Sequence, residues 1–177
     1  RKKEAEREKL TNIFKYCEKR GWGNKCNHDE FVKRFGFQYD NGIIDATSTN
    51  IAYDNMTCDA VCQTVRKSQN KKSEYEIGEV LTCREYLVAN KRLKLAFHVN
   101  YEYIIRSVDE FMILENKITR ERISCGNGKV RTHFRFAYCN TVHSSQGSSV
   151  DGKLVIFGYS HPYATMRWLW TAITRAR

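Results

Sequence analysis

Apolar positions near the start of the chain recur with the spacing of one helix face. The stripe has the i, i+3, i+4, i+7 pattern and consists of Leu10, Ile13, Phe14 and Cys17. It predicts a helix over residues 1–20, which ends where two glycines and an asparagine follow in residues 21–24. A second, short helix is predicted over residues 29–35.

Further along, the periodicity changes to short apolar runs. Residues 42–46 follow a turn signal and predict a buried strand. Residues 47–50 are Thr, Ser, Thr and Asn, side chains that cap helices, so a helix is expected through about Lys67. Its inward side chains would be Ile51, Met56, Ala60 and Val61. A strand followed at once by a helix is typical of α/β folds.

Residues 75–131 have a different character, with β-rich runs that are short and closely spaced. The runs are residues 80–83, 93–97, 101–108 and 111–114, with turns expected at 109–110 and 126–128. They predict a small antiparallel β unit, a barrel, inserted into the α/β domain. The expected division is therefore a helical segment 1–41, an α/β domain made of 42–74 and 132–177, and the insertion 75–131.

After the insertion, residues 134–140 and 154–157 predict buried strands, and residues 165–177 predict a last helix. The apolar face of that helix is Leu169, Ala172, Ile173 and Ala176. Trp168, Thr171 and Arg175 share another face, which we expect to point at a ligand.

Bulk composition fits one ordinary domain or two small ones. The 177 residues are 41% hydrophobic and 12% aromatic, enough to bury a core, and no run approaches the about 20 apolar residues of a membrane span. The chain begins at Arg1 and stops within a helical pattern, so we expect a piece of a longer protein. Its seven cysteines form no CxxC pair, which favours buried thiols over a zinc site. Without a secretory signal, an intracellular location is expected, in nucleus, cytoplasm or a viral replication site.

The formal charge is +10, from 30 Lys and Arg against 20 Asp and Glu. This excess favours a polyanionic partner, most simply nucleic acid, although a basic surface can also serve solubility alone. A membrane partner is disfavoured because no basic helix with an aromatic face stands out. Within the β unit, Lys and Arg could line a nucleic-acid path or simply protect edge strands.

Candidate chemistry concentrates in residues 140–151, between two apolar runs. Short donors (Thr141, Ser144 and Ser145), His143, Gln146 and Gly147 suit phosphate recognition, because a glycine lets backbone come close to a phosphate. An ordinary Ser/Gly turn is the alternative. Thr49 and Asn50 could likewise bind phosphate or merely cap a helix. Arg175, on a helix with a buried face, could stabilise charge on a transferring γ-phosphate or form an ordinary salt bridge.

Two segments resemble known motifs. Residues 138–147, YCNTVHSSQG, resemble motif V of superfamily 1 helicases, and residues 170–177, WTAITRAR, resemble motif VI. The resemblance implies a second RecA-like motor domain, the UvrD-like C-terminal half, with a parallel sheet and flanking helices. It implies that Arg175 is an arginine finger, that Gln146 and Gly147 bind nucleotide, and that Thr141, His143 and Ser144 contact single-stranded DNA. Thr49 and Asn50 resemble the start of the helix after motif IV, which touches DNA phosphate.

Ser149 stands where many UvrD-type members carry a glutamate, so the chain is more similar to RecD-like and phage Dda-like helicases. That branch implies an inserted barrel, with residues 100–102 resembling its hairpin, 5′-to-3′ movement and a role in DNA replication, as in viral relatives. ATP and Mg²⁺ would be held mainly by a P-loop domain elsewhere in the longer chain, because no G-x-x-x-x-G-K-[ST] occurs here. We therefore expect this piece alone to be inactive.

Two other interpretations stay open. One is a catalytically inert basic domain that binds nucleic acid, RNA not excluded, or a protein partner. The other is a nuclease fragment, which no cluster of carboxylates with metal-binding spacing supports.

Overall fold

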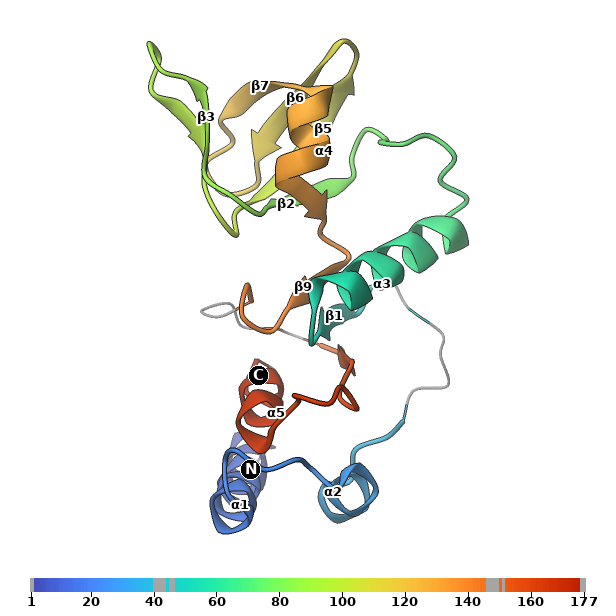
Figure 1. The fold of residues 1–177 in the computed structure, drawn as a ribbon, viewed down its shortest axis with the longest axis vertical. Coiled ribbons are helices and arrows are strands. Elements are labelled where there is room, and N and C mark those ends of the chain that lie inside the picture. The colour runs from blue at the N-terminus through green and yellow to red at the C-terminus, as the bar shows by residue number, and fades with distance from the viewer. Residues whose placement is uncertain (1, 40–43, 45–46, 146–149, 151, 176–177) are drawn as a thin grey trace. The chain divides into compact units, whose positions relative to one another are not determined.

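The structure is a computed structural model that describes residues 2–39, 44, 47–145, 150 and 152–175 (Figure 1). Its contacts divide the chain into two compact units. The first unit comprises Arg1–Cys58 and Asn140–Arg177, and the second comprises Asp59–Cys139. Each unit is described by itself below.

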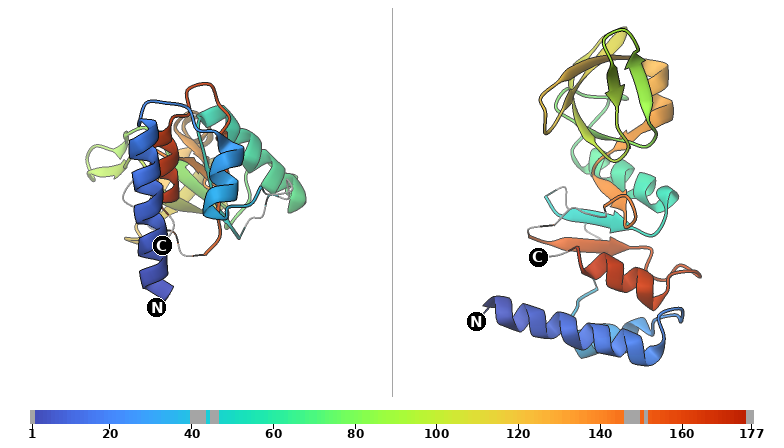
Figure 2. Two further views of the ribbon diagram at one scale, coloured as in Figure 1. Left: turned by 90° about the horizontal axis from the view of Figure 1, so that it is seen from below. Right: turned by 90° about the vertical axis from the view of Figure 1, so that its left-hand side faces the viewer.

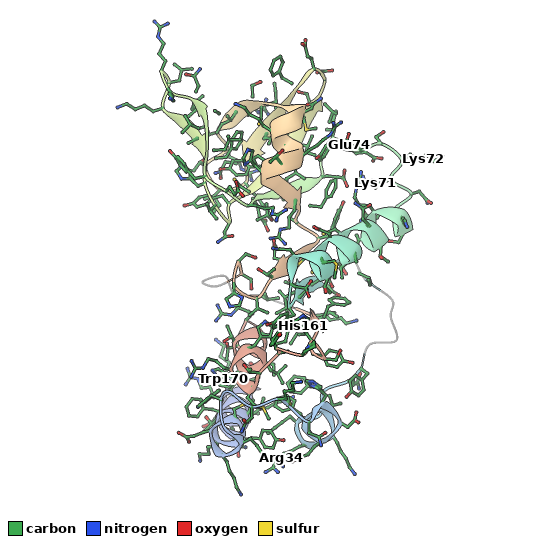
Figure 3. The ribbon with its side chains drawn as sticks, viewed as in Figure 1. Arg34, Lys71, Lys72, Glu74, His161 and Trp170 are labelled. Atoms are coloured by element: carbon green, nitrogen blue, oxygen red, sulfur yellow. The ribbon has the colours of Figure 1, made fainter. Side chains whose placement is uncertain are left out.

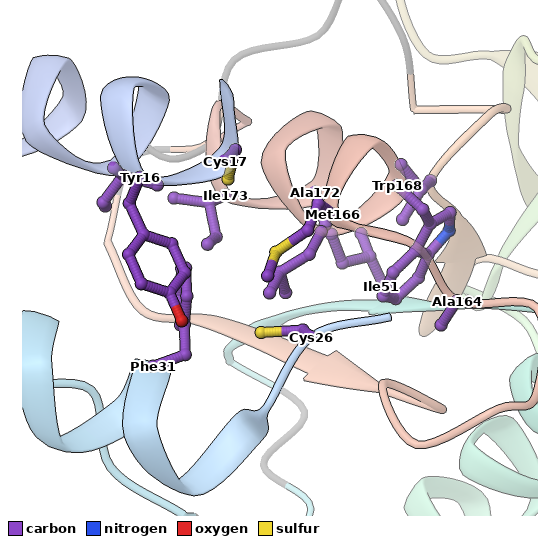
Figure 4. Close-up of a cluster of buried hydrophobic side chains, with 13 residues drawn as sticks. Tyr16, Cys17, Cys26, Phe31, Ile51, Ala164, Met166, Trp168, Ala172 and Ile173 are labelled. Carbon is purple, nitrogen blue, oxygen red and sulfur yellow. The ribbon is translucent and has the colours of Figure 1, made fainter. Parts of the chain in front are cut away.

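Three helices enclose the core of the first unit: α1 (Lys2–Arg20), α2 (His28–Phe35) and α5 (Met166–Ile173). Helix α1 lies beside α5 in both views of Figure 2. The predicted stripe of α1 buries Ile13 and Cys17 completely, whereas Phe14 is half-exposed and contacts Trp170 edge-on. Figure 4 shows Tyr16 of α1 reaching toward Phe31 of α2. The two N-terminal helices are thus confirmed.

A three-stranded sheet completes this unit, in the order β10 (Leu154–Phe157), β1 (Thr49–Ala52), β9 (Cys139–Thr141). Strands β1 and β10 are parallel, with Asn50 opposite Val155. The α/β fold with a parallel sheet is therefore confirmed, as is the strand predicted over residues 154–157.

The chain around β1 differs from the prediction. Thr49 and Asn50 lie in the strand rather than in a loop tip, and the helix that follows, α3, covers Asn55–Ser68. Its buried stripe is Cys58, Val61, Cys62 and Val65, which leaves Met56 80% exposed and Ala60 exposed. Met56 and Ala60 are four positions apart and share one face of α3, which lies away from the buried stripe and faces solvent. The strand predicted over residues 42–46 lies outside the described residues except Ile44, which is in no strand.

The second unit is built on a five-stranded antiparallel sheet with the order β7-β6-β5-β2-β8. Its strands are β2 (Val80–Cys83), β5 (Glu102–Val108), β6 (Phe111–Asn116), β7 (Arg122–Gly126) and β8 (Phe134–Phe136). A separate hairpin pairs β3 (Leu87–Asn90) with β4 (Leu95–Phe97). The antiparallel pairing is as predicted, but the barrel is wrong: within the described residues β7 and β8 remain unpaired edges of an open sheet.

Two further differences concern helices. The predicted turn at residues 126–128 is instead the start of α4 (Asn127–His133). Helix α5 ends at Ile173, so Arg175 lies in the turn that follows it rather than within a helix. Trp168 packs in the core with 7% of its surface exposed, so it does not share a ligand-facing side with Arg175. In the described part of the chain, no helix is long and apolar enough to cross a membrane.

Candidate functional site

The candidate site lies where the parallel strands of the first unit end. Ala52 and Phe157 are opposite each other at the carboxyl ends of β1 and β10. The turn after β9 reaches the same edge, because the Val142 N–H donates to the Ala52 carbonyl at 3.2 Å. In open α/β sheets, ligands bind at this edge.

The turn of residues 141–145 is closed by its own hydroxyl groups. The Thr141 and Ser144 hydroxyls lie 3.0 Å apart, and the Ser144 hydroxyl also bonds to the Thr141 carbonyl at 3.0 Å. The Ser145 hydroxyl donates to the Val142 carbonyl at 2.9 Å. Three of the predicted phosphate donors therefore fix the shape of the turn. A ligand that bonds to one of these hydroxyl groups must share it with the hydrogen bond that it already makes within the turn. His143 between them is exposed.

Arg175 is held by three hydrogen bonds, one of which its backbone N–H donates to the Ala172 carbonyl at 3.2 Å. Its Nε donates to the Thr171 carbonyl at 3.1 Å, and its own carbonyl accepts from the Val150 N–H at 2.9 Å. Neither Nη group bonds to a described residue, so four N–H donors remain for a ligand. Val150 directly follows the segment that contains Gln146 and Gly147, which lie outside the described residues. The chain just beyond the first motif-like segment, at Val150, thus bonds to the second segment at Arg175.

Thr49 and Asn50 are at the opposite end of β1 from this edge. The Thr49 N–H donates to the Lys153 carbonyl at 2.9 Å, and Asn50 is 3% exposed. Their predicted contact with nucleic acid stays a prediction, and a buried Asn50 side chain gives it no geometric support.

An aromatic pair at the same edge was missed from the sequence. The rings of Tyr53 and His161 stack with centroids 4.1 Å apart and planes 15° apart. Figure 3 labels His161. Gly158, at φ +70°, permits this packing, since a Cβ there would lie 3.0 Å from the Tyr53 Cβ. Nearby, Tyr163 is 76% exposed. The signal in the sequence was the His-Pro-Tyr run at 161–163.

One negative charge also lies beside this edge. Asp54 accepts a hydrogen bond of 2.7 Å from the Thr57 N–H at the start of α3, and this bond holds the pKa of its carboxyl below the usual value. The carboxylate therefore occupies the donors of the first turn of α3. A phosphate is better placed beside the turn of residues 141–145 than at α3. Among the described residues, no group of three or more His, Cys, Asp or Glu is placed to hold a metal ion.

The residues at this edge of the sheet fall within a match to a known protein family. The family described as "UvrD-like helicase C-terminal domain" matches residues 136–177, which contain the turn of residues 141–145, β10, α5 and Arg175. Residues 136–177 are therefore similar to this helicase family. No curated protein matches the chain.

Solved helicase structures are similar in fold to most of the chain. Bacteroides Pif1 helicase in complex with ADP-AlF3 and ssDNA has a TM-score of 0.56 at 16% identity, covering 95% of this chain and 46% of that one. Bacteroides Pif1 bound to ssDNA has a TM-score of 0.53 at 14% identity, covering 95% and 45%. A structure of DNA unwinding at forked dsDNA by two coordinating Pif1 helicases has a TM-score of 0.51 at 16% identity, covering 75% and 38%.

The chain therefore spans less than half of the length of each of these helicases. The superfamily 1 resemblance is confirmed by the family match and the shared fold. The narrower assignment to the RecD-like and Dda-like branch stays a prediction, as do the roles of the individual residues.

Proposed function

We propose that this chain is the second motor domain of an ATP-dependent DNA helicase. The observation that carries the proposal is the hydrogen bond from the Val150 N–H to the Arg175 carbonyl. It joins the segment after the exposed His143 to the turn that holds Arg175, all within the match to a helicase domain. A change at one segment can therefore move the other, as a motor requires.

The residues fit a nucleotide that another domain holds. Arg175 is anchored through Nε and presents its Nη groups, the arrangement that suits a bidentate contact with a phosphate. Bound ATP with Mg²⁺ would supply the phosphoryl group whose transfer to water drives movement. The part of Arg175 is to neutralise charge that develops on that group. Gln146 and Gly147 belong to the same proposal.

Single-stranded DNA is the proposed track, with RNA as the other substrate to test. His143 projects from the internally bonded turn and can donate to a backbone phosphate, while Thr141 and Ser144 fix the turn. The stacked Tyr53 and His161 beside it offer an aromatic surface of the kind on which bases stack. The Pif1 structures described as bound to ssDNA support this choice of ligand by analogy.

The wider context of the proposal rests on resemblance alone. We infer a role in DNA replication, with 5′-to-3′ movement, inside the cell in a nucleus, cytoplasm or viral replication site. The domain division into 1–41, 42–74 with 132–177, and 75–131 is part of the same inference.

The test is Arg175→Ala in the longer protein that contains the P-loop domain. ATP turnover stimulated by single-stranded DNA should fall by about 10³-fold or more, because the side chain acts on the transition state. Affinity for single-stranded DNA should stay within about threefold, since the side chain is assigned to ATP. If turnover stays within a few-fold of wild type, the chain is better described as an inert binding domain.

A further inference from the structure

We propose that a groove between α1 and α2 is a second nucleic-acid site, which binds the phosphate backbone without reading sequence. The groove has a volume of about 970 Å³. It lies within the first unit, on the segment that the helicase family match does not cover. Five cationic side chains and one carboxylate line it: Lys9, Lys15, Lys19, Arg20 and Arg34 with Glu8.

Helix periodicity produces this surface. Lys9, Lys15 and Lys19 are exposed and line the groove. Lys15 and Lys19 project away from the fully buried Ile13 and Cys17, whereas the Lys9 Nζ lies 4.5 Å from the centroid of the Phe37 ring. Lys9 and Lys19 are ten positions apart, about 15 Å along the helix axis at 1.5 Å per residue. Arg34 projects from α2 to form the opposite wall (Figure 3). The groove is therefore an elongated cationic track rather than a point site.

Most of these charges are available to a ligand. Within the described residues, only Arg20 among the five cations has a carboxylate partner, Glu30, at 2.7 Å. Arg20 and Arg34 both lie over the ring of Tyr16, with Cζ to centroid distances of 5.4 and 5.3 Å. Cation–π packing of this kind orders a guanidinium while leaving its N–H donors for another group. Two arginines are thus held in place at one end of the track.

The chemistry favours a nucleic-acid backbone over other polyanions. Tyr16 is 7% exposed and two guanidinium groups lie over its ring, so this ring is not open for a base to stack on. Lysines spaced along a groove suit a repeating series of phosphates. Binding to an anionic membrane would need large exposed apolar side chains beside the charges, and Phe35, the one large wholly apolar side chain of the lining, is partly buried. The proposal concerns binding alone and does not rest on ATP hydrolysis.

A fluorescence anisotropy titration of the 177-residue chain tests the groove. The probe is a fluorescein-labelled 20-nucleotide oligothymidine, measured at two salt concentrations. The groove variant is Lys15→Gln/Lys19→Gln/Arg34→Gln. The matched control is Lys3→Gln/Lys25→Gln/Lys33→Gln, which removes the same charge from exposed positions of α1, α2 and the segment between them that do not line the groove.

The groove variant should bind at least about tenfold more weakly and lose about two units of salt slope, since each single-strand phosphate contact contributes about 0.7. The control should change affinity less than about threefold, through net charge alone. Equal losses in both variants would overturn the proposal, as would wild-type binding by the groove variant. Chain that binds vesicles of phosphatidylserine but not the oligonucleotide would also overturn it.

Two further variants keep the result interpretable. Lys15→Gln/Lys19→Gln removes no ion pair or cation–π contact with a described residue. It therefore tests the groove even if the loss of Arg34 from the Tyr16 ring disturbs folding of the triple variant. Its far-ultraviolet circular dichroism spectrum should match that of wild type. His143→Ala separates the two sites. If His143→Ala loses binding while the groove variant binds like wild type, the groove proposal is wrong and the proposed function stands. If the groove variant loses binding while His143→Ala binds like wild type, the groove proposal stands and the DNA contact assigned to His143 is wrong.

Discussion

The cations of the groove in the first unit and three arginines of the second unit differ in whether they pair with carboxylates. In the second unit, three arginines are held by two largely buried carboxylates: Arg66 by Glu79 at 2.9 Å, and Arg106 and Arg122 by Glu115 at 2.8 and 2.9 Å. In the first unit, the groove of α1 and α2 holds four cations that have no carboxylate partner among the described residues. A net charge of +10 does not reveal this difference. A polyanion is bound best by charges that the fold leaves unpaired, so we expect the groove to bind it more strongly than Arg66, Arg106 and Arg122 do.

Removing Glu79 should have the largest effect on folding. Arg66 and Glu79 are 7% and 3% exposed, and Arg66 also donates to the Ser73 carbonyl at 2.7 Å. Glu79→Ala leaves a buried guanidinium without its counter-charge, which should lower the free energy of unfolding by about 3–5 kcal/mol. Urea denaturation followed by circular dichroism measures this change.

The control for that variant is Glu110→Ala, at an exposed position of the same unit. It should change the free energy of unfolding by no more than about 0.5 kcal/mol. A loss below about 1 kcal/mol in Glu79→Ala would show that the pair is not a structural element of the second unit, contrary to this comparison.

Glu115 tests the pairing through pH. Hydrogen bonds from Arg106 first and Arg122 next lower the pKa of the Glu115 carboxyl from 4.5 to about 2. Because the folded-state pKa is depressed, its contribution to stability is present above pH 4.5 and is lost as the pH falls toward 2. Across this window the thermal midpoint of Glu115→Gln should fall less steeply than that of wild type, which scanning calorimetry measures.

The same variant should slightly raise affinity for the oligothymidine probe, by about two- to threefold, because it leaves the arginines without their carboxylate. A large gain of tenfold or more would mean that the second unit already forms part of the nucleic-acid surface. Equal acid sensitivity of the variant and wild type would contradict the pKa shift.

The elements that the sequence predicted correctly are those defined by local periodicity. The stripe of Ile13 and Cys17 predicted α1, and the apolar run Leu154–Phe157 predicted β10. Residues 49–55 were misassigned because Thr and Asn favour helix caps locally, whereas pairing with β10 draws Thr49 and Asn50 into a strand. Closure of a barrel depends on pairing between distant edges, which no short pattern encodes.

In the candidate site, too, local sequence patterns were informative, whereas contacts made through tertiary packing could not be predicted. The motif-like segments pointed to a helicase family without any geometry, and residues 136–177 match such a family. The roles predicted for Thr141, His143 and Arg175 stay predictions. What the sequence could not give was the internal bonding of the turn, the end of α5 before Arg175, or the stack of Tyr53 on His161. Each of these joins residues through tertiary packing or through a few backbone angles, and neither leaves a periodic pattern.

The most direct test of the central claim is the charge-preserving variant Arg175→Lys in the longer protein, measured as single-turnover ATP hydrolysis with saturating single-stranded DNA. A lysine keeps the charge but loses both the Nε anchor to the Thr171 carbonyl and the bidentate fork. We predict a fall in the hydrolysis rate of about 100-fold or more, with DNA affinity within about twofold of wild type. A rate within a few-fold of wild type would contradict the assignment of Arg175 to the nucleotide.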